Sequence, residues 1–142
     1  MDKISGSSVV YIDTNIFVYF VEATPNFFQK VKELFEHVAD VGARLVTSEI
    51  TLAECIYRPS QERDAPLVSV YEMLFEQSGE IDLVPLDGAI AKRATAAGGS
   101  LGLKLIDAIH YMSALEAGCD FFVTSGSAYK SGPKMAVLRV AG

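Results

Sequence analysis

Apolar residues fall into short continuous runs that alternate with stretches of helical spacing. The runs predict five strands, over residues 9–12, 44–47, 81–86, 121–124 and 136–140. Apolar residues three and four apart predict helices over about 27–41, 52–57, 67–77, 87–97 and 103–117. This alternation predicts an α/β fold, a three-layer α/β/α sandwich around a central, mostly parallel five-stranded sheet.

Proline, glycine and capping residues set the expected ends of several elements. The helix over 52–57 is expected to end before Pro59, because the residue before a proline disfavours helical geometry. Residues 61–66 are expected to form a polar loop. Asp87 is expected to cap a helix that residues 98–100 and Gly102 then break. No repeat or linker divides the chain, so we expect a single domain over residues 1–142.

Composition and charge narrow the class of protein. Half of the 142 residues are apolar and are spread along the chain, which suits one folded core. No apolar stretch reaches about 18 residues, and residues 1–6 do not resemble a signal peptide, so a cytoplasmic protein is expected. Cys55 and Cys119 lack metal-ligand spacing and are expected to be buried free thiols. The net charge of -6 argues against bulk coating of nucleic acid but allows local binding.

Three carboxylates stand near the junctions between strands and helices. Asp13 directly follows the first run, Glu54 lies on the helix after the second run, and Asp107 lies in the first turns of the late helix. The carboxyl ends of parallel strands meet at one sheet edge, so the three acids are expected near one another. Carboxylates without a cysteine or histidine cluster favour Mg²⁺ or Mn²⁺. Such ions assist phosphoryl transfer, so the set is a candidate active site.

Each acid also has a simpler structural interpretation. Asp13 is a preferred residue for capping the helix that follows it. Glu54 alone would be a solvated helix residue, and Asp107 could cap its helix or pair with Lys104. These alternatives lose weight when the three positions are taken together, but they stay open.

The ordered set of sequence pieces resembles the PIN domain, and within it the small VapC-like toxins of prokaryotic toxin–antitoxin pairs. The pieces are residues 10–15, 47–54, 105–110 and 114–124. The resemblance spans nearly the whole chain in order and spacing. It implies a divalent-metal-dependent endoribonuclease that uses Mg²⁺ or Mn²⁺, acts on RNA, binds a cognate antitoxin and forms a homodimer.

The resemblance also assigns roles to individual residues. Asp13 and Asp107 would ligate the ion, and Glu54 would be a ligand or would orient the attacking water. Asn15 and Thr124 would position carboxylates or phosphate by hydrogen bonds.

The chain departs from the family pattern at one position. The family commonly has a fourth acid two residues after the threonine that ends the fourth strand, and here that residue is Gly126. Ser125 or Ser127 could hold a water at the ion, but a hydroxyl supplies no charge for a second cation. A one-metal enzyme, a slow enzyme and a catalytically inactive PIN-like module that binds RNA or protein all stay open. A phosphatase with Asp13 as nucleophile is disfavoured, because Asn15 stands where that class usually has a second aspartate.

Other polar and aromatic residues have less specific interpretations. His110, one helical turn after Asp107, is expected to be a hydrogen-bonded structural histidine. Aromatic residues at helical spacing are expected in the core or a subunit interface rather than in base stacking; they are Phe17, Tyr19, Phe20, Phe27, Phe28 and Phe35. Basic residues expected near the site are treated as solvated charge, with phosphate contact as the alternative; they are Arg58, Arg63, Lys104, Lys130 and Lys134.

Overall fold

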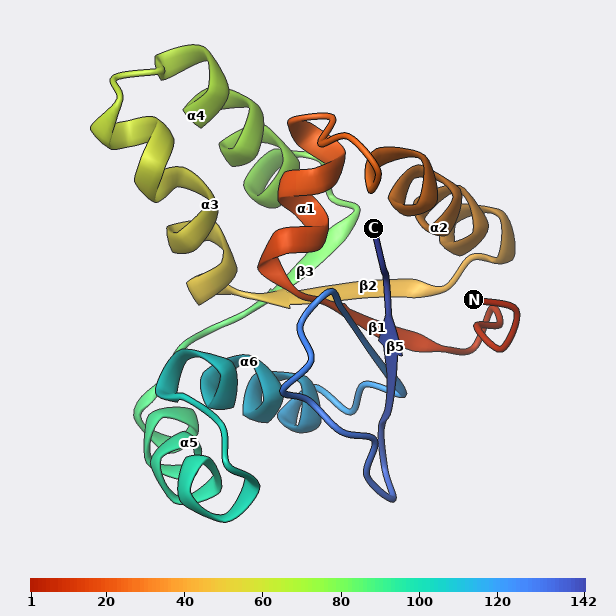
Figure 1. Cartoon of the computed structure of the whole chain (residues 1–142), viewed down its shortest axis with the longest axis vertical. Helices are drawn as coiled ribbons and strands as arrows, with labels where there is room; N and C mark the ends of the chain where they lie inside the picture. The colour runs from red at the N-terminus through yellow and green to blue at the C-terminus, as the bar shows by residue number, and fades with distance from the viewer.

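The computed structural model describes all 142 residues and contains one five-stranded sheet in the order β3-β2-β1-β4-β5 (Figure 1). The strands are β1 (Val9–Ile12), β2 (Arg44–Ser48), β3 (Ile81–Val84), β4 (Phe121–Thr124) and β5 (Ala136–Arg139). The helices are α1 (Thr14–Val21), α2 (Phe28–Val41), α3 (Glu49–Gln61), α4 (Ala65–Glu72), the π-helix η1 (Met73–Gln77), α5 (Gly88–Leu101) and α6 (Leu105–Glu116). All neighbouring strands are parallel, so the predicted α/β architecture is confirmed with a wholly parallel sheet.

Two apolar layers enclose the central strands. Helices α1 to α4 lie on one side of the sheet, and α5 and α6 lie on the other (Figure 1). The first layer is built around Phe17, Tyr71 and Phe75, and the second around Tyr11 and Phe122. Because β1 is the middle strand, its carboxyl end opens between the helices of both layers, which makes it the natural position for a site.

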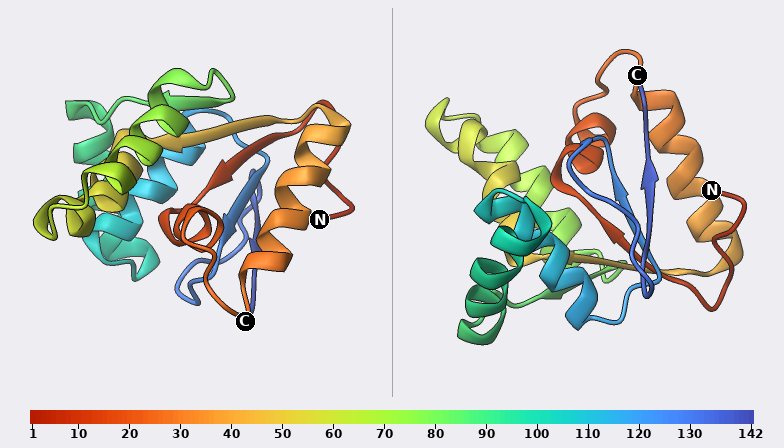
Figure 2. Two further views of the ribbon diagram at one scale, coloured as in Figure 1. Left: turned by 90° about the horizontal axis from the view of Figure 1, so that it is seen from above. Right: turned by 60° about the horizontal axis from the view of Figure 1, so that its bottom comes forward.

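Both chain termini lie beside α2 (Figure 2). His37 on this helix donates to the carbonyl of Ile4 over 3.0 Å. Lys30, nearer the start of the same helix, donates to the carbonyl of Ala141. Each terminal segment is therefore held to α2 by a hydrogen bond, and Ile4 is itself buried in the first layer.

Two helices continue past their expected ends. Helix α3 passes through Pro59 to Gln61. Because Pro59 stands in the last turn, its missing N–H removes only one hydrogen bond before the helix ends. Helix α5 passes through residues 98–100 and ends at Gly102, which has a φ of 67°. A Cβ at Gly98 would lie 3.1 Å from the Leu103 carbonyl oxygen, so this glycine permits the chain to fold back closely rather than breaking the helix.

Two further boundaries differ from the prediction. The expected loop over 61–66 is shortened, because α4 already begins at Ala65 with Asp64 as its cap. The third strand ends at Val84 rather than at residue 86. Pro85 follows immediately and has no N–H to donate to a neighbouring strand. Both free thiols are buried as expected, at Cys55 and Cys119.

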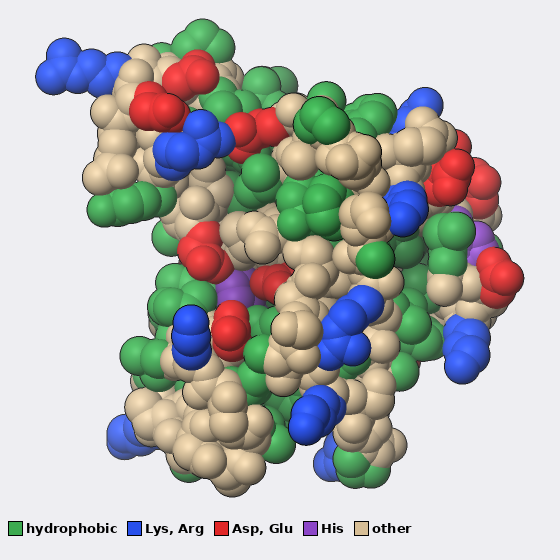
Figure 3. All heavy atoms as spheres, in the orientation of Figure 1, with side chains coloured by type: hydrophobic (Ala, Val, Ile, Leu, Met, Phe, Trp, Pro, Cys, Tyr) green, Lys and Arg blue, Asp and Glu red, His purple; other side chains and the backbone are tan.

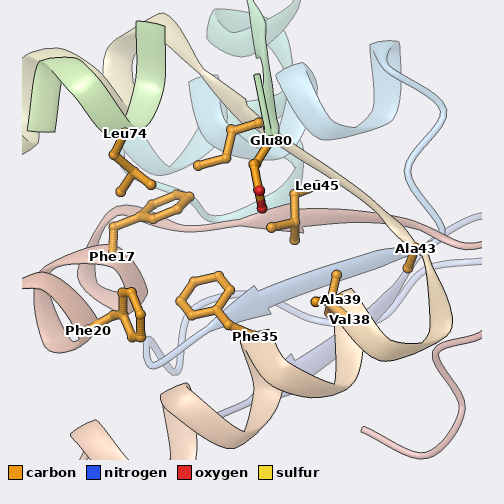
Figure 4. A pocket seen from close by; sticks show the side chains of 10 residues that line it. Phe17, Phe20, Phe35, Val38, Ala39, Ala43, Leu45, Leu74 and Glu80 are labelled. Carbon is orange, nitrogen blue, oxygen red and sulfur yellow. The ribbon is translucent and has the colours of Figure 1, made fainter. Parts of the chain in front are cut away.

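The aromatic residues of the early helices pack against one another on the first layer; Phe17 is buried in the core, as predicted, whereas the other five are half-buried, so the interface alternative stays open for them. The rings of Phe17 and Phe35 are stacked with centroids 5.9 Å apart, and those of Tyr19 and Phe27 are stacked at 4.0 Å. An apolar cavity of about 230 Å³ lies between α1, α2, β2 and η1 (Figure 4). Its only charged lining residue is Glu80, and it contains none of the predicted site residues. No helix has the length and apolar character needed to cross a bilayer.

Replacing Tyr71 with phenylalanine tests the polar contact that ties α4 to α1. Tyr71 is buried, and its hydroxyl donates to Oε2 of Glu22 over 2.6 Å. Burial, followed by the contact with Glu22, raises the pKa of Tyr71 well above its usual range, so the hydroxyl stays a donor. We expect Tyr71→Phe to lower the free energy of unfolding by about 1–2 kcal/mol in urea titrations. Tyr57→Phe, at a side chain that is 65% exposed, is the control and should change nothing.

Candidate active site

Asp13 lies at the carboxyl end of the central strand β1 and is fixed by partners on both of its oxygens. Its Oδ1 accepts the N–H of Thr14 over 2.9 Å, so Asp13 does cap α1. Its Oδ2 accepts the hydroxyl of Thr124, at the end of the neighbouring strand β4, over 2.7 Å. The Thr124 hydroxyl in turn accepts the N–H of Gly126 over 2.9 Å. The capping interpretation and the active-site interpretation are therefore compatible at Asp13.

Glu54 and His110 meet beside Asp13. Nε2 of His110 lies 2.6 Å from Oε1 of Glu54 and 3.7 Å from Oδ1 of Asp13. The hydroxyl of Thr14 also donates to Oε1 of Glu54, over 2.7 Å. Partial burial of Glu54 would raise its pKa, but the hydrogen bonds from His110 and Thr14 outweigh burial, so the pKa is lowered. Glu54 is therefore held as a carboxylate and is not simply a solvated helix residue.

Asp107 is held by a different donor. The hydroxyl of Tyr129 donates to Oδ1 of Asp107 over 3.0 Å, and Tyr129 is buried. Burial, followed by the charges of Asp13 and Asp107, raises the pKa of Tyr129 well above its usual range. The phenol therefore stays protonated beside the two carboxylates. Asp107 makes no ion pair with Lys104, and no side chain caps α6, so neither structural alternative for Asp107 is seen.

The acids surround a recess between α3 and α6, where Figure 3 shows acidic side chains gathered around a histidine. Oε2 of Glu54 and Oδ2 of Asp107 have no hydrogen-bond donor from the protein. Free carboxylate oxygens are the donors that a hard cation such as Mg²⁺ or Mn²⁺ takes, so the chemistry of this set fits such an ion. The side chains nevertheless do not converge as three ready ligands around one point. The structure thus brings Asp13 and Glu54 together around His110 and holds Asp107 separately through Tyr129.

The other predicted site residues occupy different surroundings. Asn15 is exposed beside Asp13 and makes no hydrogen bond through its side chain. The hydroxyl of Ser125 shares a hydrogen bond with that of Tyr19 over 3.1 Å, whereas Ser127 is exposed. Thr124 is therefore the predicted partner with a direct contact to an acid.

Of the five basic residues expected near the site, only Arg58 is paired with acids. Arg58 pairs with Glu22 and Glu62 away from the recess. The other four make no ion pair; they are Arg63, Lys104, Lys130 and Lys134. These four side chains are exposed, so solvated charge and phosphate contact both stay open for them.

Three residues that build the site were not predicted for it. His110 was expected to be hydrogen-bonded, which is correct, but its position between two acids was missed. Its separation from Asp107 by one helical turn was the available signal. Thr14 and Tyr129 gave no such signal, because a threonine after an aspartate and a tyrosine in a loop are both common.

Arg139 fixes the loop that carries Gly126 and Tyr129. Its Nε donates to the carbonyl of Gly126 over 2.8 Å, and its Nη2 donates to the carbonyls of Ser127 and Tyr129. A lysine cannot reproduce this fork, because its ammonium is a single point donor. We expect Arg139→Lys to increase amide hydrogen exchange over residues 126–131. It should also lower the free energy of unfolding by about 1–2 kcal/mol. Lys134→Arg, on the exposed part of the same loop, is the control and should leave exchange unchanged.

Comparison with known proteins identifies the family. The PIN domain profile matches residues 10–133, and the chain belongs to the PIN domain family. The fold is similar to that of VapBC2 from Rickettsia felis bound to a promoter DNA fragment, with 18% identity, a TM-score of 0.68, and coverage of 92% of this chain and 98% of that chain. A toxin–antitoxin complex from Klebsiella pneumoniae gives 19% identity, a TM-score of 0.67, and coverage of 91% and 95%. VapC20 from Mycobacterium tuberculosis, a sarcin–ricin loop cleaving toxin, gives 13% identity and a TM-score of 0.65. The match covers 80% of this chain and 86% of that chain. No curated protein matches the chain in sequence.

Proposed function

We propose that this PIN-domain protein is a divalent-metal-dependent endoribonuclease and the toxin of a type II toxin–antitoxin pair. The observation that carries the proposal is the position of Asp13 at the end of the central strand, with Glu54 and His110 meeting it from two helices. PIN domains are typically nucleases, and structural neighbours include VapC toxins.

In this proposal each side chain has a defined task. Asp13 and Asp107 hold the ion, Mg²⁺ or Mn²⁺, and Thr124 and Tyr129 fix the orientation of these carboxylates. When bound, the ion neutralises charge on the scissile phosphate and lowers the pKa of water. Glu54 accepts a hydrogen bond from the attacking water and orients it, so that hydrolysis proceeds by direct attack of water, without a covalent enzyme intermediate. Asn15, Ser125 and Ser127 lie at the same edge and hydrogen-bond the substrate.

Chelation tests metal dependence directly. The purified protein is incubated with RNA and Mn²⁺, and cleavage is followed on gels with and without EDTA. We expect internal cleavage that EDTA abolishes and that excess Mn²⁺ restores. Cleavage that survives EDTA would contradict the proposal. Glu80→Gln is the control variant and should cleave as the parent does, because Glu80 lines the separate apolar cavity.

The proposal includes a cognate antitoxin and a homodimer as partners. Its support is that similar folds include a toxin–antitoxin complex from Klebsiella pneumoniae, and FitAB bound to a DNA fragment. Light scattering of the purified protein tests the dimer. Co-expression with the product of a neighbouring small open reading frame tests the antitoxin, since a true pair should co-purify and lose cleavage.

A second candidate is a PIN-like module that binds RNA or protein without cleaving. Gly126 favours it, because the acid common at this family position is missing. Such a module would bind RNA in a filter assay equally well with Mn²⁺ and with EDTA and would release no fragments. The chelation experiment therefore separates the two candidates.

A further inference from the structure

The imidazole of His110 is engaged at both ring nitrogens inside the site. The side chain is buried, with a relative exposure of 1%. Its Nδ1 lies 2.7 Å from the hydroxyl of Tyr11 on β1, and its Nε2 lies 2.6 Å from Oε1 of Glu54 on α3. The histidine on α6 therefore links the central strand to the acid on a helix of the opposite layer.

The hydroxyl of Tyr11 determines which nitrogen of His110 carries the proton. Tyr11 is fully buried, which raises its pKa well above the usual range, and hydrogen bonding with the hydroxyls of Thr51 and Thr47 partly offsets this. Nδ1 of His110, 2.7 Å away, is left as the acceptor for the Tyr11 proton. A buried hydroxyl proton without an acceptor is costly, so Tyr11 donates to Nδ1, and Nδ1 must be unprotonated. The ring proton is then on Nε2, where it points to Glu54.

The consequence for Glu54 is that its two oxygens differ. Oε1 accepts both from His110 and from the hydroxyl of Thr14, which lies 2.7 Å away. Oε2 has no donor from the protein, and the Glu54 side chain is 37% exposed. One oxygen is thus fixed from within the protein, and the other is left for solvent or substrate.

We propose that His110 is a positioning residue: Tyr11 holds it in the Nε2–H tautomer, and its N–H fixes Glu54 so that Oε2 faces the reacting side. The inference rests on the proposed function, in which Glu54 orients the attacking water. His110 itself contacts neither substrate nor ion in this arrangement. Thr14 shares the task but lies on α1, so the histidine is the contact that joins Glu54 to the opposite layer of the fold.

Nitrogen-15 NMR tests the tautomer without any need for activity. The chain has only two histidines, so His37→Gln leaves the signals of His110 alone in long-range ¹H–¹⁵N spectra. We expect a protonated Nε2 and an unprotonated Nδ1 at neutral pH. Tyr11→Phe should leave Nε2 protonated, because Glu54 still accepts from it, but should shift the Nδ1 resonance as this nitrogen loses its donor, while the protein stays folded by circular dichroism. An Nδ1–H ring in the unaltered site, two protonated nitrogens, or no response to Tyr11→Phe would overturn the inference.

Kinetics then test the effect on Glu54. We expect His110→Gln to lower kcat for RNA cleavage by about 10- to 100-fold with KM nearly unchanged, and Tyr11→Phe to cause a smaller loss of the same kind. His37→Gln, which alters a histidine bonded to the Ile4 carbonyl on the far side of α2, should leave both constants unchanged. A folded His110→Gln protein with the parent kcat would overturn the positioning role. If the parent cleaves no RNA but shows the expected tautomer, the proposed function fails and the geometry at Glu54 stands.

Discussion

Asp13→Asn is expected to lower RNA hydrolysis by about 100-fold or more, because loss of a metal-holding charge costs several kcal/mol in the transition state. The fold should survive the change. Asparagine caps helices as well as aspartate does, and its Oδ1 can still accept the N–H of Thr14. Cleavage rates on a defined RNA, measured with saturating Mn²⁺, give the effect.

Asp107→Asn is expected to act in the same way. Its Oδ1 can keep the hydrogen bond from Tyr129, so the local structure is retained while the charge is lost. The matched control is Asp87→Asn, which makes the same substitution at the cap of α5 and should not affect cleavage. An Asp13→Asn protein that cleaves as fast as the parent would show that the site has been assigned wrongly.

Calorimetric titration of Mn²⁺ separates loss of binding from loss of chemistry. We expect the parent to bind Mn²⁺ and Asp13→Asn to lose this binding. The stoichiometry for the parent then shows whether one ion or two are held. A parent that binds no Mn²⁺, even with RNA present, would favour the non-catalytic module.

The strands were the most predictable part of the fold. Short apolar runs buried between two helical layers leave little ambiguity, and the fourth strand, Phe121–Thr124, has the predicted bounds. Helix ends were less predictable because close approaches that form only in the folded chain decide them. At Gly98, the close approach of the Leu103 carbonyl explains the glycine, and this approach is visible only in the folded chain.

The candidate site, like the fold, could be predicted from the sequence only in part. The position of Asp13 followed from the rule that parallel strands present their carboxyl ends at one edge. The contact between His110 and Tyr11 joins residues that are 99 positions apart, and no spacing pattern indicates it. Tyr129 lies in a loop without periodicity, so its bond to Asp107 was equally hidden. Sequence therefore predicted which acids to examine, whereas their orienting partners required the structure.

Gly126→Asp is expected to raise cleavage by at least about tenfold, if the missing acid is what limits the enzyme, since each 1.4 kcal/mol of transition-state stabilisation gives a factor of ten. The position accepts a side chain. A Cβ at Gly126 would lie 3.4 Å from Oγ1 of Thr124 and 3.6 Å from the ring of Tyr129, which are ordinary contacts. Because the Thr124 hydroxyl bonds Oδ2 of Asp13, the new carboxylate would enter the same acidic recess.

The added charge should have opposite effects on the free and the metal-bound protein. Without metal, repulsion between the new carboxylate and Asp13 should lower the melting temperature of Gly126→Asp. With Mn²⁺, the fourth acid should raise ion affinity, and the melting temperature should increase more than it does in the parent. Gly126→Asn matches the shape without the charge, and Ser127→Asp places the charge one residue away. If either control reproduces the gain in cleavage, or if Gly126→Asp gains metal affinity without activity, then the missing carboxylate is not what limits catalysis.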